Sequence, residues 1–419
     1  MHGRSDRYRL TLVVFWVLAF ATVPALWVLQ PPPPGLNDLH VYGNAIRSLQ
    51  AGRDPYADGI AVQRVFHGQL AQHPDAIPPY TYVYSPITLP LLRAIGRLPS
   101  GIAGALYWAM YAAGLLAAVL VGVRFAEPGE TRLFNLLAPA AAFFPGLLQA
   151  DVLMSGNLAY ILYGLVFATA LVGWRRGDWR WFYIATVGVS CFKAPMLTLL
   201  AIPVLSARSQ WLPAGLAAGG GLVLFAAQPL LWPSLFHNYL EAVALQFSYN
   251  HDFGLSLAGL LGNVLFYYGL PYSLASTLCY LVYGSLVLAT LLYLSRRYFA
   301  GDLSLERWMP VALLGVVLLN PRIKEYDIAP LTLPMAMVLW RVCARGNSMR
   351  RAAVTASLLF AAANAIAIFA WKPTEGILLV ALFIAGSWNL LRESRKSRGS
   401  PVSVAGADRI AFRDGAVSV

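Results

Sequence analysis

The sequence has few charged residues for its length. Of 419 residues, 12% are charged and 58% are hydrophobic, and the mean hydropathy is +0.60. A soluble protein carries about a quarter charged residues, so this chain has too little polar surface for a soluble fold. Several apolar runs also reach the ~20 residues that cross the hydrocarbon core as a helix: 10–29, 212–232, 271–294 and 352–371. We therefore predict an all-α polytopic membrane protein.

Lysine, cysteine and metal-ligand patterns are scarce too. Only four of the 31 basic residues are lysines, and the arginines form short clusters between apolar runs, as orientation signals do. A nucleic-acid interface would instead gather them on one polar domain. The three cysteines lie in apolar segments without CxxC spacing, which excludes a disulfide framework. The six histidines show no ligand spacing and no glycine-rich phosphate loop follows a strand, so we expect no metal and no cofactor.

The arginine clusters predict an orientation. The segments assigned to the inner side hold 22 of the 31 basic residues: 1–9, 124–133, 174–181, 206–211, 296–307, 341–351 and 392–419. This asymmetry follows the positive-inside rule. It predicts roughly 10–12 transmembrane helices with both termini cytoplasmic. The first helix, 10–29, continues past a weak cleavage site, so we interpret it as an uncleaved anchor.

The chain is expected to form one transmembrane domain over residues 1–391. An outer loop with an amphipathic helix covers 30–83, and a basic, disordered tail covers 392–419. The segment 181–205 is either one span or a tight hairpin broken near Lys193, and 254–270 is either a span or a re-entrant piece. The other expected spans are 84–98, 101–123, 134–150, 157–173, 272–295, 308–320, 327–340, 352–371 and 375–391.

No acidic residue lies at the centre of a clean apolar run. Ion-coupled transporters usually carry carboxylates at mid-membrane depth, so this pattern argues against that class. Lys193 is the only charge within an apolar run. It either snorkels from a helix end to the surface or faces a buried anion.

The first polar tract follows the first helix. Four prolines at 31–34 predict an extended spacer, and Asn37 or Asp38 can then cap a helix that runs to about Gln50 and stops at Gly52. Asp38 is either a helix cap or a carboxylate held at the membrane surface, where a catalytic base would be needed. The following Asp54 precedes a proline, which is typical of a turn.

A second tract, 320–327, reads Asn-Pro-Arg-Ile-Lys-Glu-Tyr-Asp. Its two cations and two carboxylates either pair with one another or bind a phosphate headgroup. Asn157 enters a span and is costly there unless paired, so it is a candidate for the same cavity. Several aromatic residues near these tracts could stack on sugar faces, but for most of them we expect an interfacial aromatic belt instead: Tyr42, Tyr56, Tyr80, Tyr82, Tyr84 and Trp232.

The polar tracts described above resemble the motifs of a known enzyme family. The acidic residue after helix one, then Val-Tyr and Ala-Gly-Arg-Asp-Pro-Tyr at 51–56, resembles the opening of the polyprenyl-phosphate-mannose-dependent mannosyltransferases, a GT-C family that includes the enzymes of phosphatidylinositol mannosides. Gly156-Asn157, the Lys193-Ala194-Pro195 break and the 320–327 tract resemble later family motifs. In order and spacing the resemblance spans roughly residues 10–390.

The resemblance implies an inverting GT-C glycosyltransferase that moves a sugar from a polyprenyl phosphate to an acceptor hydroxyl of a lipid, glycan or protein. Mannose is the expected sugar and arabinofuranose the alternative. It implies a bacterial inner-membrane protein with its site on the periplasmic face. Asp38 would be the base and Arg322, Lys324 and Lys193 would bind the donor phosphate. The remaining candidates would contact substrate: His40, Tyr42, Asn157, Glu325, Tyr326 and Asp327.

Two other functions remain open. A transporter or flippase of lipid-linked sugars would use the same basic tract for binding without chemistry, and an acyl- or phosphotransferase could act on the same face. Replacement of Asp38 by asparagine separates the first of these from the glycosyltransferase, because only the enzyme needs a base.

Overall fold

The computed structural model describes residues 37–69, 79–127, 130, 155–250, 253–348 and 373–399, with scattered positions between 351 and 366. Within this part of the chain all regular secondary structure is helical. Five helices are long and apolar enough to cross a membrane: Ser100–Arg124, Trp211–Leu231, Ser273–Phe299, Glu325–Ala344 and Thr374–Arg395. The all-α class is thus confirmed for the described residues, and their five candidate spans are consistent with a helical membrane protein. The total of 10–12 spans stays a prediction, because segments 10–29, 134–150 and most of 352–371 lie outside the described residues.

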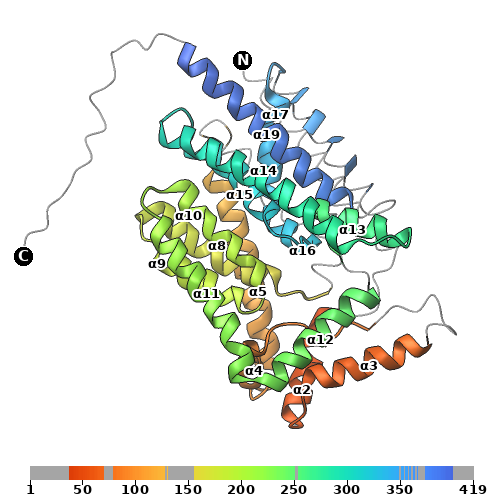
Figure 1. Ribbon diagram of the computed structural model, residues 1–419. Helices are drawn as coiled ribbons and strands as arrows, with labels where there is room; N and C mark the ends of the chain where they lie inside the picture. The colour runs from red at the N-terminus through yellow and green to blue at the C-terminus, as the bar shows by residue number, and fades with distance from the viewer. Residues whose placement is uncertain are drawn as a thin grey trace, which may run out of the picture.

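The described elements follow one another as Figure 1 shows. In chain order they are α2 (Asn37–Gln50), α3 (Pro55–Gln69), η1 (Pro86–Thr88), α4 (Leu89–Ile95), α5 (Ser100–Arg124), α8 (Ala159–Arg176), α9 (Arg180–Ser190), η2 (Ala194–Leu200), α10 (Ala201–Ser206), α11 (Trp211–Leu231), α12 (Pro233–Asn250), α13 (Leu257–Tyr267), α14 (Ser273–Phe299), α15 (Leu305–Leu318), α16 (Glu325–Ile328), η3 (Ala329–Leu331), α17 (Thr332–Ala344) and α19 (Thr374–Gly399).

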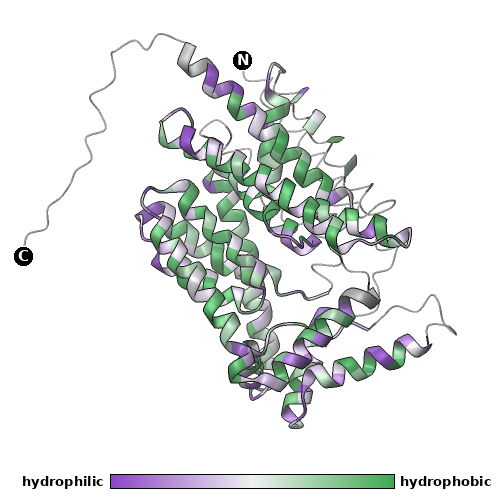
Figure 2. Cartoon of the chain, in the orientation of Figure 1, coloured by the Kyte–Doolittle hydropathy of each residue, from purple (hydrophilic) through white to green (hydrophobic). Residues whose placement is uncertain are grey.

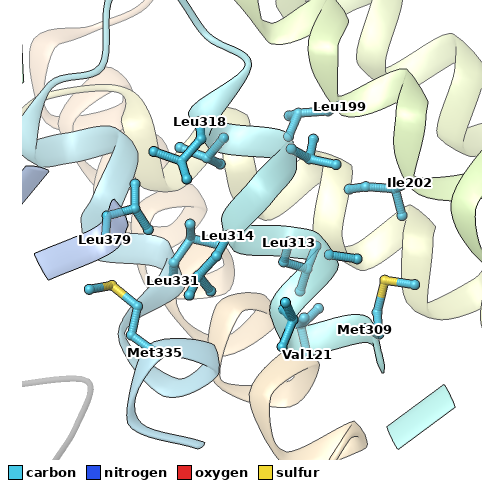
Figure 3. Packing of buried hydrophobic residues seen from close by; sticks show 14 of the residues in the cluster. Val121, Leu199, Ile202, Met309, Leu313, Leu314, Leu318, Leu331, Met335 and Leu379 are labelled. Atoms are coloured by element: carbon cyan, nitrogen blue, oxygen red, sulfur yellow. The ribbon is translucent and has the colours of Figure 1, made fainter. Parts of the chain in front are cut away.

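Helix α15 forms the centre of the core. Every residue from Trp308 to Leu318 is buried, so this helix is apolar on all faces. It packs against α10, α14, α17 and α19, and Figure 3 shows its leucines meeting side chains of η2, α10, α5 and α17. A helix that is hydrophobic all round is stable only where neighbours cover each face.

Helices α11 and α14 instead expose apolar side chains. Leu216 and Leu230 of α11 are 69% and 85% exposed, and Val282 and Leu286 of α14 are 63% and 64% exposed. Figure 2, which colours each residue by its hydropathy, shows many hydrophobic residues along both helices. Such continuous apolar faces are costly in water and favourable against lipid chains, which is consistent with membrane embedding.

The 181–205 segment is a tight hairpin, so the single-span alternative is wrong. Helix α9 stops at Ser190, and η2 and α10 lead the chain back. The two ends of the hairpin lie together, because the Tyr183 hydroxyl donates to Gln210 Oε1 at 2.9 Å. Lys193 lies at the tip, where the backbone is extended before Pro195.

Helix α13 has 11 residues, about 16 Å of helix, which is too short to cross the membrane.

One end of the bundle is closed by ion pairs. Arg307 of α15 contacts Glu127 at 2.6 Å and Glu393 at 2.7 Å. Arg341 of α17 pairs with Glu130 at 2.8 Å and donates to the Phe125 carbonyl at 2.8 Å. Four helix ends therefore meet at one end of the molecule. All four belong to segments predicted to lie on the inner side of the membrane, so the contacts agree with that prediction.

The outer loop and the tail differ from expectation in detail. The predicted helix from Asn37 to Gln50 is confirmed, with Gly52 at φ +69° after it. A second helix, α3, follows directly, because Pro55 starts it and Asp54 accepts the Tyr56 N–H at 2.8 Å. The predicted turn is thus a helix start. Helix α19 runs to Gly399, so residues 392–399 are helical and the prediction of a disordered tail from 392 was wrong for them.

Close packing of α5 on α8 generates a test. A Cβ at Gly114 would lie 1.9 Å from the Tyr160 carbonyl oxygen, and one at Gly164 would lie 2.2 Å from the Gly114 Cα. Small residues let membrane helices approach in this way. We expect Gly114→Ala to lower the melting temperature of the detergent-solubilised protein, as overpacking costs about 1–3 kcal/mol. Gly104→Ala in the same helix meets nothing within 4 Å and should not lower it; equal losses in both variants would contradict the packing account.

Candidate functional site

A cavity of about 410 Å³ lies among α2, the start of α8, the hairpin tip, α12 and α16. This volume is in the range of small-molecule sites. The cavity brings together eight of the ten residues singled out from the sequence: Asp38, Asn157, Lys193, Arg322, Lys324, Glu325, Tyr326 and Asp327. Segments separated by almost 290 residues thus meet in one place.

The first wall is the start of α2. Its N–H groups need acceptors, and the Ser155 carbonyl accepts from Asp38 N at 2.9 Å and from Leu39 N at 3.0 Å. The Asn157 side-chain amide donates to Asp38 Oδ2 at 2.9 Å, while its own oxygen accepts the Ala159 N–H at 2.9 Å. Gly156 adopts φ +68° to make this turn. Asn157 is therefore paired, as its place at the start of a span requires, and it orients the Asp38 carboxylate.

Burial raises the pKa of Asp38 above its usual value of 3.8. Loss of water around the carboxylate is the main cause, and the nearby Glu325 carboxylate adds to it. The hydrogen bond from Asn157 and the Lys324 ammonium act in the opposite direction. A carboxylate with a raised pKa is a stronger proton acceptor than an exposed aspartate, as a base requires.

The opposite wall is built on a buried ion pair. The Lys193 ammonium contacts both Asp327 oxygens, at 2.6 Å for Oδ2. Asp327 is fully buried, and it also accepts from the Tyr163 hydroxyl at 3.1 Å and from Lys324 N at 2.9 Å. The ammonium lies 4.5 Å from the centre of the Tyr326 ring. Of the two interpretations of Lys193, the buried-anion partner is confirmed and snorkelling was wrong.

Asp327 therefore has a structural role, because its oxygens are occupied by donors. A carboxylate that accepts from these three donors is poorly suited to act as a base in place of Asp38. Glu325 lines the same cavity and lies 3.9 Å from the Lys324 ammonium.

The loop carrying Arg322 is held in place by the segment before α13. Leu255 N donates to the Ile323 carbonyl at 2.7 Å, and the Ser256 hydroxyl donates to the Pro321 carbonyl at 2.7 Å. Gly254 has φ +82°, and a Cβ there would lie 2.7 Å from the Ile323 oxygen. These contacts place the Arg322 and Lys324 side chains along the cavity rather than leaving them in a solvated loop.

Two predicted residues do not line the cavity. His40 is exposed on the surface of α2, and Tyr42 is buried behind the wall. Tyr42 hydrogen-bonds the Tyr84 hydroxyl at 2.9 Å, and Tyr84 does line the cavity.

The buried tyrosines of the outer loop do not form an interfacial belt. Tyr56 and Tyr82 are buried and their ring centres lie 5.7 Å apart. The Tyr56 hydroxyl donates to the Tyr84 carbonyl at 2.5 Å. They form a compact aromatic core beneath α2 and α3. The expected belt was thus wrong for these residues, because the loop folds into its own hydrophobic cluster.

Several cavity residues carry no motif in the sequence. Tyr163, Phe192, Tyr239 and Gln246 all line the cavity. Only Tyr163 had a local signal, as a polar aromatic one and a half turns after Asn157 in an otherwise apolar run. The contribution of α12 could not be read from its sequence, because nothing local indicates which face meets the cavity.

The arrangement brings a partly buried carboxylate, Asp38, into one cavity with the cations of Arg322, Lys324 and Lys193, which lie beside the carboxylates of Glu325 and Asp327. It can therefore bind a ligand that carries a negative group at one end and presents an acidic proton or hydroxyl at the other.

Within the described residues no group of three or more histidine, cysteine and acidic side chains could hold a metal ion. Comparison with known proteins found no family model and no curated protein that matches the chain.

The Lys193–Asp327 pair can be tested by a double-mutant cycle. Removing one partner leaves a buried charge, which costs about 3–5 kcal/mol, whereas removing both leaves none. We expect Lys193→Met and Asp327→Leu each to lower the melting temperature in detergent, and the double variant to lower it less than the two single losses combined. Additive losses would show that the two side chains do not interact.

The raised pKa of Asp38 predicts a pH-dependent stability. A carboxylate whose pKa is higher in the folded state stabilises the fold below its unfolded pKa, and this contribution is lost as pH rises through the folded pKa. We expect Asp38→Asn to be at least as stable as the wild type at neutral pH. Its advantage in melting temperature should grow as the pH rises above the unfolded pKa of about 4. An advantage that shrinks over this range would contradict the raised pKa.

Proposed function

We propose that the protein is a membrane glycosyltransferase of the GT-C type that uses a polyprenyl-phosphate sugar as donor. The observation that carries this proposal is one cavity in which the Asp38 carboxylate on the first wall meets three cations, Lys193, Arg322 and Lys324, that lie with the Glu325 and Asp327 carboxylates on the second. Both charge types are needed to move a glycosyl group from a phosphate to a hydroxyl. Mannose is the proposed sugar and arabinofuranose the alternative, with a lipid, glycan or protein hydroxyl as acceptor.

The cations suit a phosphate leaving group. When the bond between the anomeric carbon and the phosphate oxygen breaks, negative charge builds on the phosphate. Arg322 and Lys324 can stabilise that charge directly. Lys193 stays paired with Asp327, and because it also lines the cavity, its ammonium group can donate a further hydrogen bond to the phosphate. A phosphate monoester leaves as an anion and therefore needs no general acid.

The carboxylate suits activation of the acceptor. A sugar or lipid hydroxyl has a high pKa, so a base has to take its proton as the new glycosidic bond forms. Asp38 is held by Asn157 and has a raised pKa. A single base opposite the leaving group gives direct displacement with inversion at the anomeric carbon.

The position of the cavity in the helix bundle suits a lipid donor. The cavity lies at the end of the bundle away from the Arg307 and Arg341 ion pairs, which belong to segments predicted to lie on the inner side. The positive-inside rule supports a cavity on the outer face, and the proposed location is the periplasmic face of a bacterial inner membrane, with both termini cytoplasmic. A polyprenyl chain can remain in the bilayer while its phosphate reaches the site.

The test is sugar transfer by wild type and Asp38→Asn in nanodiscs. Each protein is incubated with radiolabelled polyprenyl-phosphate mannose, then with the arabinofuranose donor, and release of sugar from the lipid is followed. We expect wild type to consume one donor and Asp38→Asn to be slower by about 10²–10⁴-fold, because the base is lost. Asp178→Asn changes a half-buried carboxylate at the turn before α9 that does not line the cavity and serves as the matched control with full activity.

Other outcomes point elsewhere. Equal consumption by wild type and Asp38→Asn would assign the base to Glu325. Binding of both donors without consumption, in the presence of membrane extract as acceptor source, would favour the transporter or flippase.

A further inference from the structure

Basic residues on the outer side are concentrated in two places. Nine basic residues lie outside the arginine-rich inner segments. Three of them, Lys193, Arg322 and Lys324, line the cavity described above. Three more line a second cavity: Arg53, Arg93 and Arg97. Arginine on the outer side runs against the usual charge bias, so a cluster of three around one cavity calls for an anionic ligand.

The second cavity has a volume of about 520 Å³ and lies between the end of α2, η1–α4 and the start of α12. Its arginines come from two segments, the turn after α2 and the end of α4. The other lining is largely apolar and includes Leu89, Leu235 and Trp232. A site with a basic rim and an apolar wall matches a molecule with an anionic head and a hydrocarbon body.

The lining of this cavity carries more positive than negative charge. Asp54 is the only acidic residue in the lining, and both its oxygens are used: Oδ1 accepts from Tyr56 N at 2.8 Å and Oδ2 from Asn238 Nδ2 at 2.7 Å. Arg53 lies 3.4 Å from Asp58. Within the described residues, no carboxylate forms an ion pair with Arg93 or Arg97, and both side chains are exposed.

The depth of the cavity fits the lipid headgroup region. Arg97 precedes α5 by three residues, and α5 then exposes apolar side chains such as Ile102, which is 56% exposed. Trp232 directly follows α11, another candidate span. Two membrane spans thus end at this cavity. Tryptophan and arginine at such a boundary contact lipid headgroups.

We propose that this second cavity binds the phosphodiester headgroup of an anionic glycerophospholipid from the same leaflet. Arg93 and Arg97, with Arg53, hold the phosphate oxygens through charged hydrogen bonds. Leu89, Leu235 and Trp232 contact the glycerol and the first acyl carbons. This binding is independent of the glycosyltransferase activity and holds whether or not that activity is found.

Helix α12 connects the two cavities. Leu235 faces the lipid site and Tyr239, one turn later, lines the first cavity. Asn238 between them bonds Asp54. A phospholipid bound against Leu235 therefore packs against the same helix that forms a wall of the first cavity.

The experiment measures lipid binding to the purified full chain by native mass spectrometry in detergent, with phosphatidylglycerol and phosphatidylcholine titrated separately. We expect wild type to prefer phosphatidylglycerol. Arg93→Gln/Arg97→Gln should weaken that binding roughly 30-fold, the effect expected from two charges next to the membrane. Arg93→Lys/Arg97→Lys keeps the charge and should retain most of the preference.

The control is Arg47→Gln/Arg64→Gln, which removes two outer arginines that line neither cavity. It should bind phosphatidylglycerol as wild type does. An equal loss in this control, or no loss in Arg93→Gln/Arg97→Gln, would overturn the proposal. Inorganic phosphate distinguishes the source of the phosphate: displacement of the lipid at equal concentration would assign the site to free phosphate. A size-exclusion profile and melting temperature matching wild type confirm that each variant is folded.

Discussion

The buried ion pair between Lys193 and Asp327 is the contact on which the site depends. It joins the tip of the α9–η2 hairpin to the short helix α16, two segments 134 residues apart. Tyr163 of α8 donates to the same carboxylate, so three parts of the bundle share one acceptor. A buried charge is tolerated only with full compensation, and this requirement fixes the relative positions of all three. The walls that carry Arg322 and Lys324 follow from that arrangement.

The charged side chains of the described residues lie mainly at the two ends of the helix bundle. The core around α15 is apolar on every side, and the exposed faces of α11 and α14 are apolar as well. Charged groups are left at the two ends of the bundle. At one end they form closed ion pairs such as Arg307 with Glu127. At the other end cations such as Arg322 and Arg93 line two cavities, and clusters of charge in cavities are where ligand binding is to be expected.

The two cavities differ in what they can do. The first sets Asp38 opposite cations and has polar groups on both walls, which suits chemistry between a phosphate and a hydroxyl. The second has arginines and an apolar lining, and its single carboxylate is fully occupied, which suits binding alone. Helix α12 and the aromatic core around Tyr56 lie between them. Both cavities thus depend on the folded outer segment after the first predicted span.

The sequence by itself determined the helical membrane class, the helix from Asn37 to Gln50 and most cavity residues, because hydropathy, capping and turn chemistry act over a few neighbouring residues. It left Lys193 with two readings and assigned the outer tyrosines to a belt. Only the tertiary structure decided these points, along with the roles of Tyr163 and α12 and the second cavity. The physical reason is that a pairing partner, such as Asp327 for Lys193, lies far along the chain, and burial is a property of the packed bundle rather than of any local segment.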